Sequence, residues 1–234
     1  MVKPRDLKSP YRGQEEWLAC LQPGILFAPR AKSVVEDPFV MPPWSHEALF
    51  GNELPVVVEY CSGNGGWIAQ QAAADPSRNW VAVEMLFDRA RKIWSKRENR
   101  ALSNLFIVCG EALDVTQRYF SSHAISQLFI NFPDPWPKRR HADKRLLRPV
   151  FLREMRRILA ADSPVTFVTD DPDYSLATIQ LFLEEGSGFA SALPAPHYQP
   201  LEEGYGSSFF EELWRDKGRE NRYHQFMKKA EGSP

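Results

Sequence analysis

A stiff, proline-rich segment that contains a carboxylate follows one of the apolar runs of this sequence. It reads NFPDPWPK and covers residues 131–138. Its three prolines restrict backbone φ angles, which limits the directions in which Asp134 and Trp136 point. A carboxylate on such a preorganised loop is suited to catalysis. A proline turn with a solvated aspartate and a packed tryptophan is an equally good interpretation of this segment alone.

Positive charge is concentrated directly after this loop. Residues 138–148, KRRHADKRLLR, contain six Lys or Arg residues and His141, with Asp143 as the only acid. Like charges at this density repel each other unless anions are near, so the run predicts contact with phosphates, as RNA would provide. The formal net charge of the chain is only −1, so the basic run is a local feature. A solvated helix face is the alternative.

A glycine-rich turn, EYCSGNGGW at residues 59–67, follows an earlier apolar run. Such a turn lets a ligand approach the backbone closely. It fits a dinucleotide fingerprint through Cys61, Gly63 and Gly66, and it fits a methyltransferase turn through Cys61, Gly63 and Gly65. In both cases a cysteine replaces the first glycine. The turn alone therefore does not separate NAD from S-adenosylmethionine.

Two carboxylates near this turn favour S-adenosylmethionine. Glu84 ends the next predicted strand, where it can accept hydrogen bonds from both ribose hydroxyls of an adenosine cofactor. Glu59 precedes the turn, where it would repel a pyrophosphate and attract an ammonium or sulfonium group. The alternative is that Glu59 forms a buried salt bridge and that Glu84 caps a helix.

Apolar runs and helical spacing alternate along the chain, and they predict a doubly wound, mostly parallel α/β sheet. The predicted strands are residues 55–60, 79–84, 104–109, 124–132 and 164–170. The predicted helices are residues 67–74, 86–98, 112–120, 144–159 and 174–183. Ligands of such sheets bind at the carboxyl ends of the strands. A carboxylate occurs at or just after each of these ends: Glu59, Glu84, Glu111, Asp134 and Asp170.

The length of 234 residues suits one sizeable core. We expect a single domain at residues 51–234, preceded by an N-terminal extension at residues 1–50 that is rich in proline and aromatic residues. No apolar run reaches the roughly 20 residues of a membrane span, which predicts a cytoplasmic protein without a membrane partner. The three scattered cysteines support neither disulfides nor a metal site. Monomer and dimer both stay open.

The motif FPDPWPK followed by RH is specific, and with it the sequence resembles the bacterial tRNA (guanine-N7)-methyltransferases. The resemblance extends from FGNELPVVVEY at residues 50–60 to the C-terminus and includes SFFEELWRDKG at residues 208–218. It implies a Rossmann-like class I S-adenosylmethionine-dependent fold, with a doubly wound, mostly parallel sheet and an antiparallel C-terminal edge strand. It also implies methyl transfer to N7 of a guanosine in the variable loop of tRNA.

The resemblance assigns roles to individual positions. Those expected to bind the cofactor are Glu59, Gly63, Gly65, Glu84, Glu111 and Asp134, and Asp134 is also the expected catalytic residue. Those expected to bind the RNA substrate are Lys138, Asp170, Ser208 and Glu211. Cys61 departs from the family, which usually has the first glycine of its turn at this position, and Ser208 replaces a threonine.

Rival functions of other classes make different predictions. An NAD-dependent oxidoreductase would need a hydride-transfer acid and an intact fingerprint, which the sequence lacks. Another nucleic-acid methyltransferase would modify a different acceptor atom. A non-catalytic RNA-binding protein with this fold would bind RNA without methyl transfer.

Overall fold

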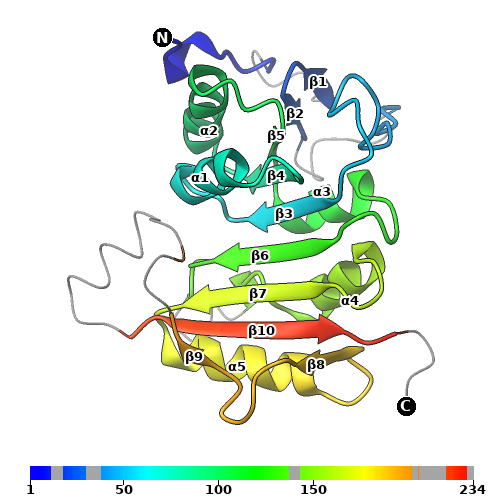
Figure 1. Cartoon of the computed structure of the whole chain (residues 1–234), viewed down its shortest axis with the longest axis vertical. Coiled ribbons are helices and arrows are strands. Elements are labelled where there is room, and N and C mark those ends of the chain that lie inside the picture. Colours follow the sequence, from blue (N-terminus) through cyan, green and yellow to red (C-terminus); the bar gives the residue numbers. More distant parts are fainter. Residues whose placement is uncertain (12–17, 30–37, 137–142, 202–204, 206–219, 231–234) are drawn as a thin grey trace. The chain divides into compact units, whose positions relative to one another are not determined.

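The computed structural model of the chain describes residues 1–11, 18–29, 38–136, 143–201, 205 and 220–230. The chain divides into two compact units, Met1–Phe120 and Ser121–Pro234. In each unit, strands and helices alternate along the chain (Figure 1). Each unit also contains its own group of the residues that the sequence predicts to be functional.

The sheet of the first unit has four neighbouring strands that run parallel. Their order is β2-β5-β4-β3, and β1 pairs with β2 in the antiparallel direction. The strands are β1 (Cys20–Gln22), β2 (Ile25–Phe27), β3 (Val56–Tyr60), β4 (Asn79–Glu84) and β5 (Leu105–Cys109). Every residue of the four parallel strands is buried, as expected for parallel strands that are covered on both faces.

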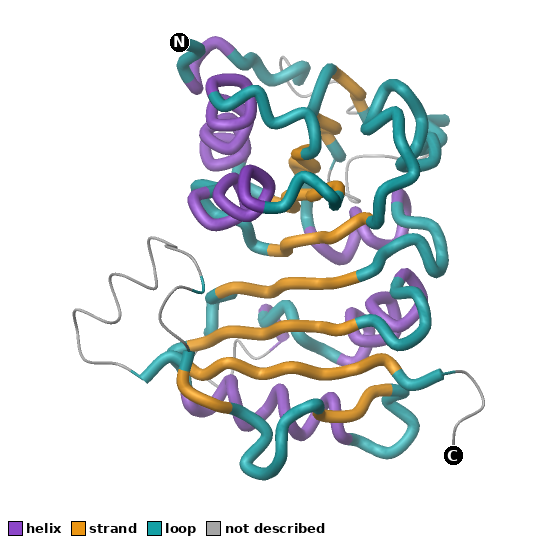
Figure 2. The backbone as a smooth tube through the Cα atoms, in the orientation of Figure 1, coloured by secondary structure: helices purple, strands orange, loops and turns teal. Residues whose placement is uncertain are grey.

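In the described part of this unit, three α-helices and one short 3₁₀ helix accompany the sheet (Figure 2). They are η1 (Pro4–Asp6), α1 (Gly66–Ala74), α2 (Phe87–Asn99) and α3 (Ala112–Tyr119). The predicted helices and strands between residues 55 and 120 agree with the observed elements to within one residue at each end. Among the residues that the structure describes, no helix combines the length and the apolar character needed to cross a bilayer.

The N-terminal extension contributes to the sheet of the first unit. Its strand β2 pairs with β5, and Trp44 packs with ring centroids 6.1 Å from Phe106 and 5.4 Å from Phe120. Sequence periodicity predicts no strand here, because β1 and β2 have three residues each and so short a run shows no period. The domain boundary at residue 50 stays a prediction.

The second unit is also built on a sheet, with the strand order β6-β7-β10-β8, and β9 pairs with β10. Its strands are β6 (Gln127–Asn131), β7 (Pro164–Thr169), β8 (Phe189–Ser191), β9 (Gln199–Pro200) and β10 (Arg222–Lys228). Its helices are α4 (Pro149–Ile158) and α5 (Pro172–Leu183). Strands β6 and β7 are parallel, so their carboxyl ends lie side by side. The predicted α/β architecture with mostly parallel strands is confirmed.

Two details of the second unit differ from the sequence prediction. Helix α4 begins at Pro149 and not at residue 144, because a residue before proline is disfavoured in the helical region; Arg148 is accordingly extended, with φ −138° and ψ 161°. The C-terminal strand β10 is antiparallel to β7, as predicted. It is not the predicted edge strand, since β8 and β9 pair with its other side.

A histidine lies in the core of the second unit. The His224 side chain is fully buried, and its ring centroid is 5.3 Å from that of Phe167. Its Nδ1 lies 3.1 Å from the carbonyl oxygen of His197, and its Nε2 lies 3.1 Å from the hydroxyl of Ser175. Because a carbonyl only accepts, Nδ1 carries the hydrogen and Nε2 accepts from Ser175. The pKa of His224 is lowered to about 4, mainly by burial and also by the nearby charge of Arg222, while the hydrogen bond to His197 opposes the shift.

Acid should therefore destabilise the protein through His224. Above pH 6.5 this histidine is neutral in both the folded and the unfolded chain, so it adds no pH dependence. Between pH 6.5 and about 4 only the unfolded chain binds the proton, so the free energy of unfolding should fall by about 3 kcal/mol. Urea denaturation over this pH range measures the effect.

The variant His224→Phe should lose this part of the pH dependence, since it cannot take up the proton in either state. Replacement of the exposed His46 by glutamine is the matched control and should leave the slope unchanged. An identical pH slope in wild type and His224→Phe would contradict the assignment.

Candidate functional site

The glycine-rich turn of the first unit connects β3 to α1. Gly63 and Gly65 have φ angles of 56° and 68°, in the left-handed region that glycine adopts without strain. The amide of Gly65 donates to the carbonyl of Ser62 (2.9 Å), and the amide of Ser62 donates to Val83 of β4 (3.2 Å). A Cβ on Gly65 would lie 2.6 Å from Cγ1 of Ile93. The turn is therefore packed against helix α2.

Glu84 connects this turn to the loop that follows β4. Its side chain is 4% exposed. Its Oε2 accepts from the amide of Gly63 (2.8 Å), and its Oε1 accepts from the amide of Leu86 (2.9 Å). Burial raises the pKa of Glu84, and these backbone hydrogen bonds oppose the rise. An ionised carboxylate has about four acceptor positions, so further acceptor capacity stays available for ligand hydroxyls.

The other two acids of this unit lie at different places in their elements. Glu59 is inside β3, one residue before its end, and is 2% exposed. Glu111 is the N-cap of α3, and its Oε2 accepts from the amide of Asp114 (2.9 Å). Glu111 therefore caps a helix, whereas the Glu84 carboxylate accepts hydrogen bonds from backbone amides in two loops. All three carboxylates belong to the carboxyl-end side of neighbouring parallel strands, as predicted.

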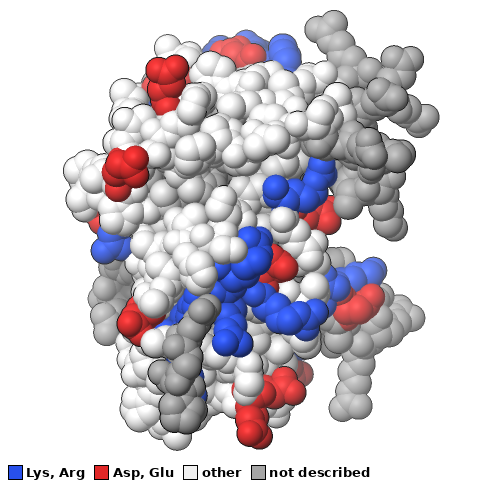
Figure 3. Space-filling view, turned by 90° about the vertical axis from the view of Figure 1, so that its right-hand side faces the viewer, with Lys and Arg blue, Asp and Glu red and all other residues white. Residues whose placement is uncertain are grey.

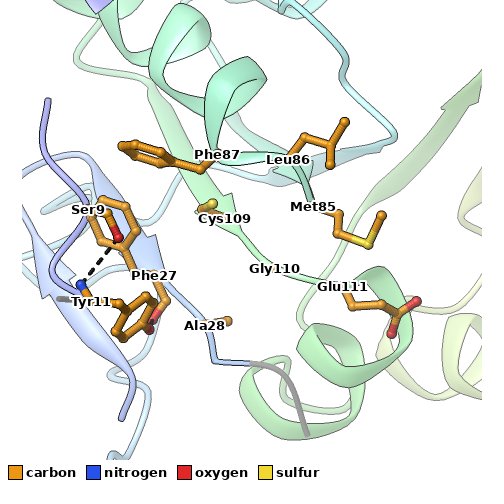
Figure 4. Close-up of a pocket in the computed structure, with 10 residues that line it drawn as sticks. All are labelled: Ser9, Tyr11, Phe27, Ala28, Met85, Leu86, Phe87, Cys109, Gly110 and Glu111. Carbon is orange, nitrogen blue, oxygen red and sulfur yellow. Dashed lines mark hydrogen bonds between the residues drawn. The ribbon is translucent and has the colours of Figure 1, made fainter. Parts of the chain in front are cut away.

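A pocket of about 370 Å³ lies at these carboxyl ends (Figure 4). Its lining residues are Ser9, Tyr11, Phe27, Ala28, Met85, Leu86, Phe87, Cys109, Gly110 and Glu111. Figure 4 shows Met85, Leu86 and Glu111 on one side and Tyr11 and Phe27 on the other. The pocket begins one residue after Glu84, so a ligand that reaches this carboxylate can extend into it.

In the second unit, the proline-rich loop leaves β6 through strained backbone. Phe132 and Trp136 have φ angles of 48° and 43°, which cost non-glycine residues of order 1–3 kcal/mol each. The amide of Phe132 donates to Val168 of β7 (2.9 Å) and continues the strand pairing into the loop. Asp134 lies between the two strained residues, and it is exposed. Strain of this kind is typical of functional loops.

Two basic residues support this loop. The Nε of Arg145 donates to the carbonyl of Pro135 (2.7 Å), and its guanidinium lies 4.9 Å from the ring centroid of Tyr174. The Nζ of Lys144 lies 5.0 Å from the ring centroid of Trp136. These two side chains thus contact the protein, although the charge pattern predicted phosphate contacts for the whole basic run.

Asp170 directly follows β7, beside the end of β6. At the same edge, the hydroxyl of Tyr205 donates to Oδ1 of the buried Asn131 (3.0 Å). The structure therefore brings Asp134 and Asp170 to adjacent strand ends. Asn131 had no predicted role, and the only sequence feature that marks it is its position as the last residue of the apolar run QLFIN.

A model of a family described as putative methyltransferases matches residues 53–223. The tRNA (guanine-N(7)-)-methyltransferase of Chlamydia trachomatis is 42% identical over 229 residues, which cover 98% of this chain and 99% of that protein. The protein of the same name from Chlamydia abortus is 41% identical over the same shares of the two chains.

The chain belongs to the tRNA (guanine-N7)-methyltransferase family. The 16S rRNA methyltransferase KamB has a similar structure, with a TM-score of 0.57 and 17% identity over 77% of this chain and 91% of that chain. At this identity the likeness concerns the fold alone. The Rossmann-like class I methyltransferase fold is thereby confirmed.

Cys61 shows how this member of the family accommodates its unusual turn. Its φ angle is 61°, so the cysteine adopts the left-handed conformation that suits the glycine usual in the family. This conformation costs an L-residue roughly 1–2 kcal/mol. A glycine at this position would adopt the same φ angle without this cost.

Some predicted residues lie outside the described part of the chain, namely Lys138, Ser208 and Glu211. No sequence pattern pointed to the pocket residues of the N-terminal region, which are Ser9, Tyr11, Phe27 and Ala28. Their only signal was the aromatic composition of that region, because nothing in a sequence pattern shows that β2 pairs with β5.

The contact between Gly65 and Ile93 predicts that Gly65→Ala will destabilise the protein by about 2–4 kcal/mol, from left-handed strain plus overpacking. Gly186→Ala is the matched control, because Gly186 has a φ angle of 81° but no atom within 4 Å of an added Cβ. It should cost about 1 kcal/mol. Urea unfolding measures both, and equal losses would show that the turn is not tightly packed against α2.

Proposed function

We propose that this protein transfers a methyl group from S-adenosylmethionine to N7 of a guanosine in tRNA. The observation that carries this proposal is the 42% identity with a tRNA (guanine-N(7)-)-methyltransferase over 98% of the chain. The placement of carboxylates at the ends of parallel strands supports it, since ligands of open α/β sheets bind there. We further propose that the target guanosine lies in the variable loop.

The residues of the first unit suit S-adenosylmethionine. The Glu84 carboxylate can accept hydrogen bonds from the ribose hydroxyls, and Gly63 leaves the backbone of the turn open to close approach. Gly65 contributes by letting the turn pack against α2. Glu59 is assigned to the positively charged methionine end of the cofactor, and Glu111 to its adenine end. Membership of the family favours this methyl donor over NAD, which fits the same kind of turn.

Guanine N7 has a free lone pair in the neutral base, so its methylation needs no prior removal of a proton. The main task of the protein is to align N7 with the methyl carbon and sulfur, which can contribute about 7 kcal/mol or more to the acceleration. Positive charge moves onto the guanine ring during transfer. We assign Asp134 as the catalytic and cofactor-contacting residue, because an exposed carboxylate on a strained loop can stabilise this charge.

RNA binding is assigned to the residues that follow the strand ends of the second unit. Lys138 and its basic neighbours would contact phosphates, and Asp170, Ser208 and Glu211 would contact the nucleotide. Figure 3 views the side of the molecule away from the arrowheads of β6 and β7 in Figure 1, so the Lys and Arg side chains that gather there are not those assigned to the RNA site. The positive charge assigned to RNA is the basic run at residues 138–148, although the formal net charge of the chain is −1. A local positive surface on a nearly neutral protein suits a polyanion.

The proposed activity is tested with labelled S-adenosylmethionine and unmodified bulk tRNA, followed by nucleoside analysis. Wild type should produce 7-methylguanosine, and Asp134→Ala should reduce the rate by at least about 100-fold. Because Asp134 is exposed, a cooperative melt should be unchanged. The exposed Glu185 of the same unit provides the control Glu185→Ala, which should keep full activity. Near-normal turnover of Asp134→Ala would rule out its catalytic role, and methylation at another atom would rule out the proposed acceptor.

Replacing Lys138, Arg139 and Arg140 together by glutamine should weaken tRNA binding. If each cation neutralises one phosphate, log K should fall less steeply with log salt, by up to about three units of slope. Filter binding at several salt concentrations measures this slope. The exposed Arg153 of α4 supplies the control Arg153→Gln. A slope that stays the same in the triple variant would remove these residues from the RNA interface.

A further inference from the structure

One wall of the pocket in the first unit is formed by residues that the proposed function does not use. Ser9 and Tyr11 come from the N-terminal segment, and Phe27 comes from the end of β2. Figure 4 shows them opposite Met85, Leu86 and Glu111. The pocket is thus shared between the loop after Glu84 and a segment about 75 residues earlier in the chain.

The N-terminal segment is attached to helix α2. The amide of Val2 donates to Oδ1 of Asn99 (2.7 Å), and Nδ2 of Asn99 donates to the carbonyl of Val2 (2.8 Å). Leu7 is 7% exposed and so belongs to the core. These contacts come before residues 9–11 in the chain and place them at the pocket.

Tyr11 connects this segment to the pocket wall. Its hydroxyl lies 3.0 Å from the carbonyl oxygens of both Leu18 and Phe27, and these two acceptors share its single hydrogen. Its ring meets that of Phe27 edge to face, with centroids 6.4 Å apart and planes at 83°. The Phe27 ring is 6.0 Å from Phe87, the first residue of α2. The rings of Tyr11, Phe27 and Phe87 are therefore successive neighbours between the N-terminal segment and the loop that contains Met85.

The residues of the opposite wall indicate the chemical class of ligand that the pocket binds. Met85 and Leu86 are 49% and 42% exposed although both are apolar, as is common at ligand sites. Burial and the Glu84 charge raise the pKa of Cys109 to about 12, so this wall carries a neutral thiol. Oε2 of Glu111 is used by the helix cap, whereas Oε1 has no hydrogen-bond donor within the described residues. Apolar walls with one carboxylate oxygen suit a flat heteroaromatic ring that carries an amino group.

We propose that residues 9–11 form part of the cofactor site, where they close the pocket on the adenine side of S-adenosylmethionine. Tyr11 is a positioning residue that fixes Phe27 and Phe87 around the base. This inference rests on the proposed function, because it takes S-adenosylmethionine as the occupant. It implies that the attachment of the N-terminus to α2 controls cofactor affinity and leaves the chemistry of transfer unchanged.

Calorimetric titration of the full chain without tRNA tests this directly. The probes are S-adenosylmethionine and 5′-methylthioadenosine, which share the adenosine group but differ in the methionine end. Tyr11→Ala should raise the Kd of both by the same factor, on the order of tenfold for the loss of an aromatic contact. In a methyl-transfer assay with tRNA and saturating cofactor, the kcat of Tyr11→Ala should stay within about twofold of wild type, since only cofactor binding is affected.

Matched variants separate positioning from general destabilisation. Tyr11→Phe keeps the ring but loses the hydroxyl that bonds Phe27, so it should raise the Kd less than Tyr11→Ala does. Asn99→Ala, which changes no pocket residue, should also raise the Kd. Tyr198→Ala, in the second unit, should leave both Kd values unchanged. If Tyr11→Ala does not fold, Ser9→Leu, which adds a side chain at the pocket wall, should weaken both probes.

Unchanged Kd values in Tyr11→Ala and Ser9→Leu would overturn this proposal and leave the proposed function intact. Weaker binding of S-adenosylmethionine with unchanged binding of 5′-methylthioadenosine would also overturn it, because the effect would then lie at the methionine end. If the wild type bound no S-adenosylmethionine, the proposed function itself would fail.

Discussion

The buried carboxylate of Glu84 accepts hydrogen bonds from two backbone amides, and the first unit's site depends on this arrangement. One amide belongs to Gly63 in the turn after β3, and the other belongs to Leu86 in the loop after β4. A single side chain therefore sets the separation of two loops on adjacent strands. Burial raises the pKa of this group, so the two amides offset part of the cost of keeping it charged. The same carboxylate is then ready to accept from a ribose.

The second unit positions Asp134 by strained neighbouring backbone and not by burial. Phe132 and Trp136 both have positive φ angles on either side of Asp134, and Arg145 holds the carbonyl of Pro135. The prolines reduce the freedom of the unfolded loop, so less entropy is lost when the loop adopts this conformation. An exposed acid thereby acquires a defined direction without being buried, which leaves it accessible to a large substrate such as RNA.

Local patterns were sufficient to predict most of the fold between residues 55 and 183. The strands β3, β4 and β5 are apolar runs, and the apolar residues of helix α2 between β4 and β5 have helical spacing, so local propensity and tertiary burial agree. The prediction was poorer where neighbours decide the structure. Arg148 looks helical by composition, yet Pro149 prevents it. Strands β1 and β2 are too short to show a period and exist because β5 offers an edge for pairing.

The chemical groups available to this protein follow from local sequence patterns, namely acids at predicted strand ends, glycines in a turn and the FPDPWPK motif. The motif also indicated the family, which the full-length relatives then established. Which of these groups line the same pocket depends on tertiary contacts. Tyr11 and Met85 come together through the pairing of β2 with β5 and the attachment of the N-terminus to Asn99. Such contacts join residues that are distant in sequence, and no local pattern encodes them.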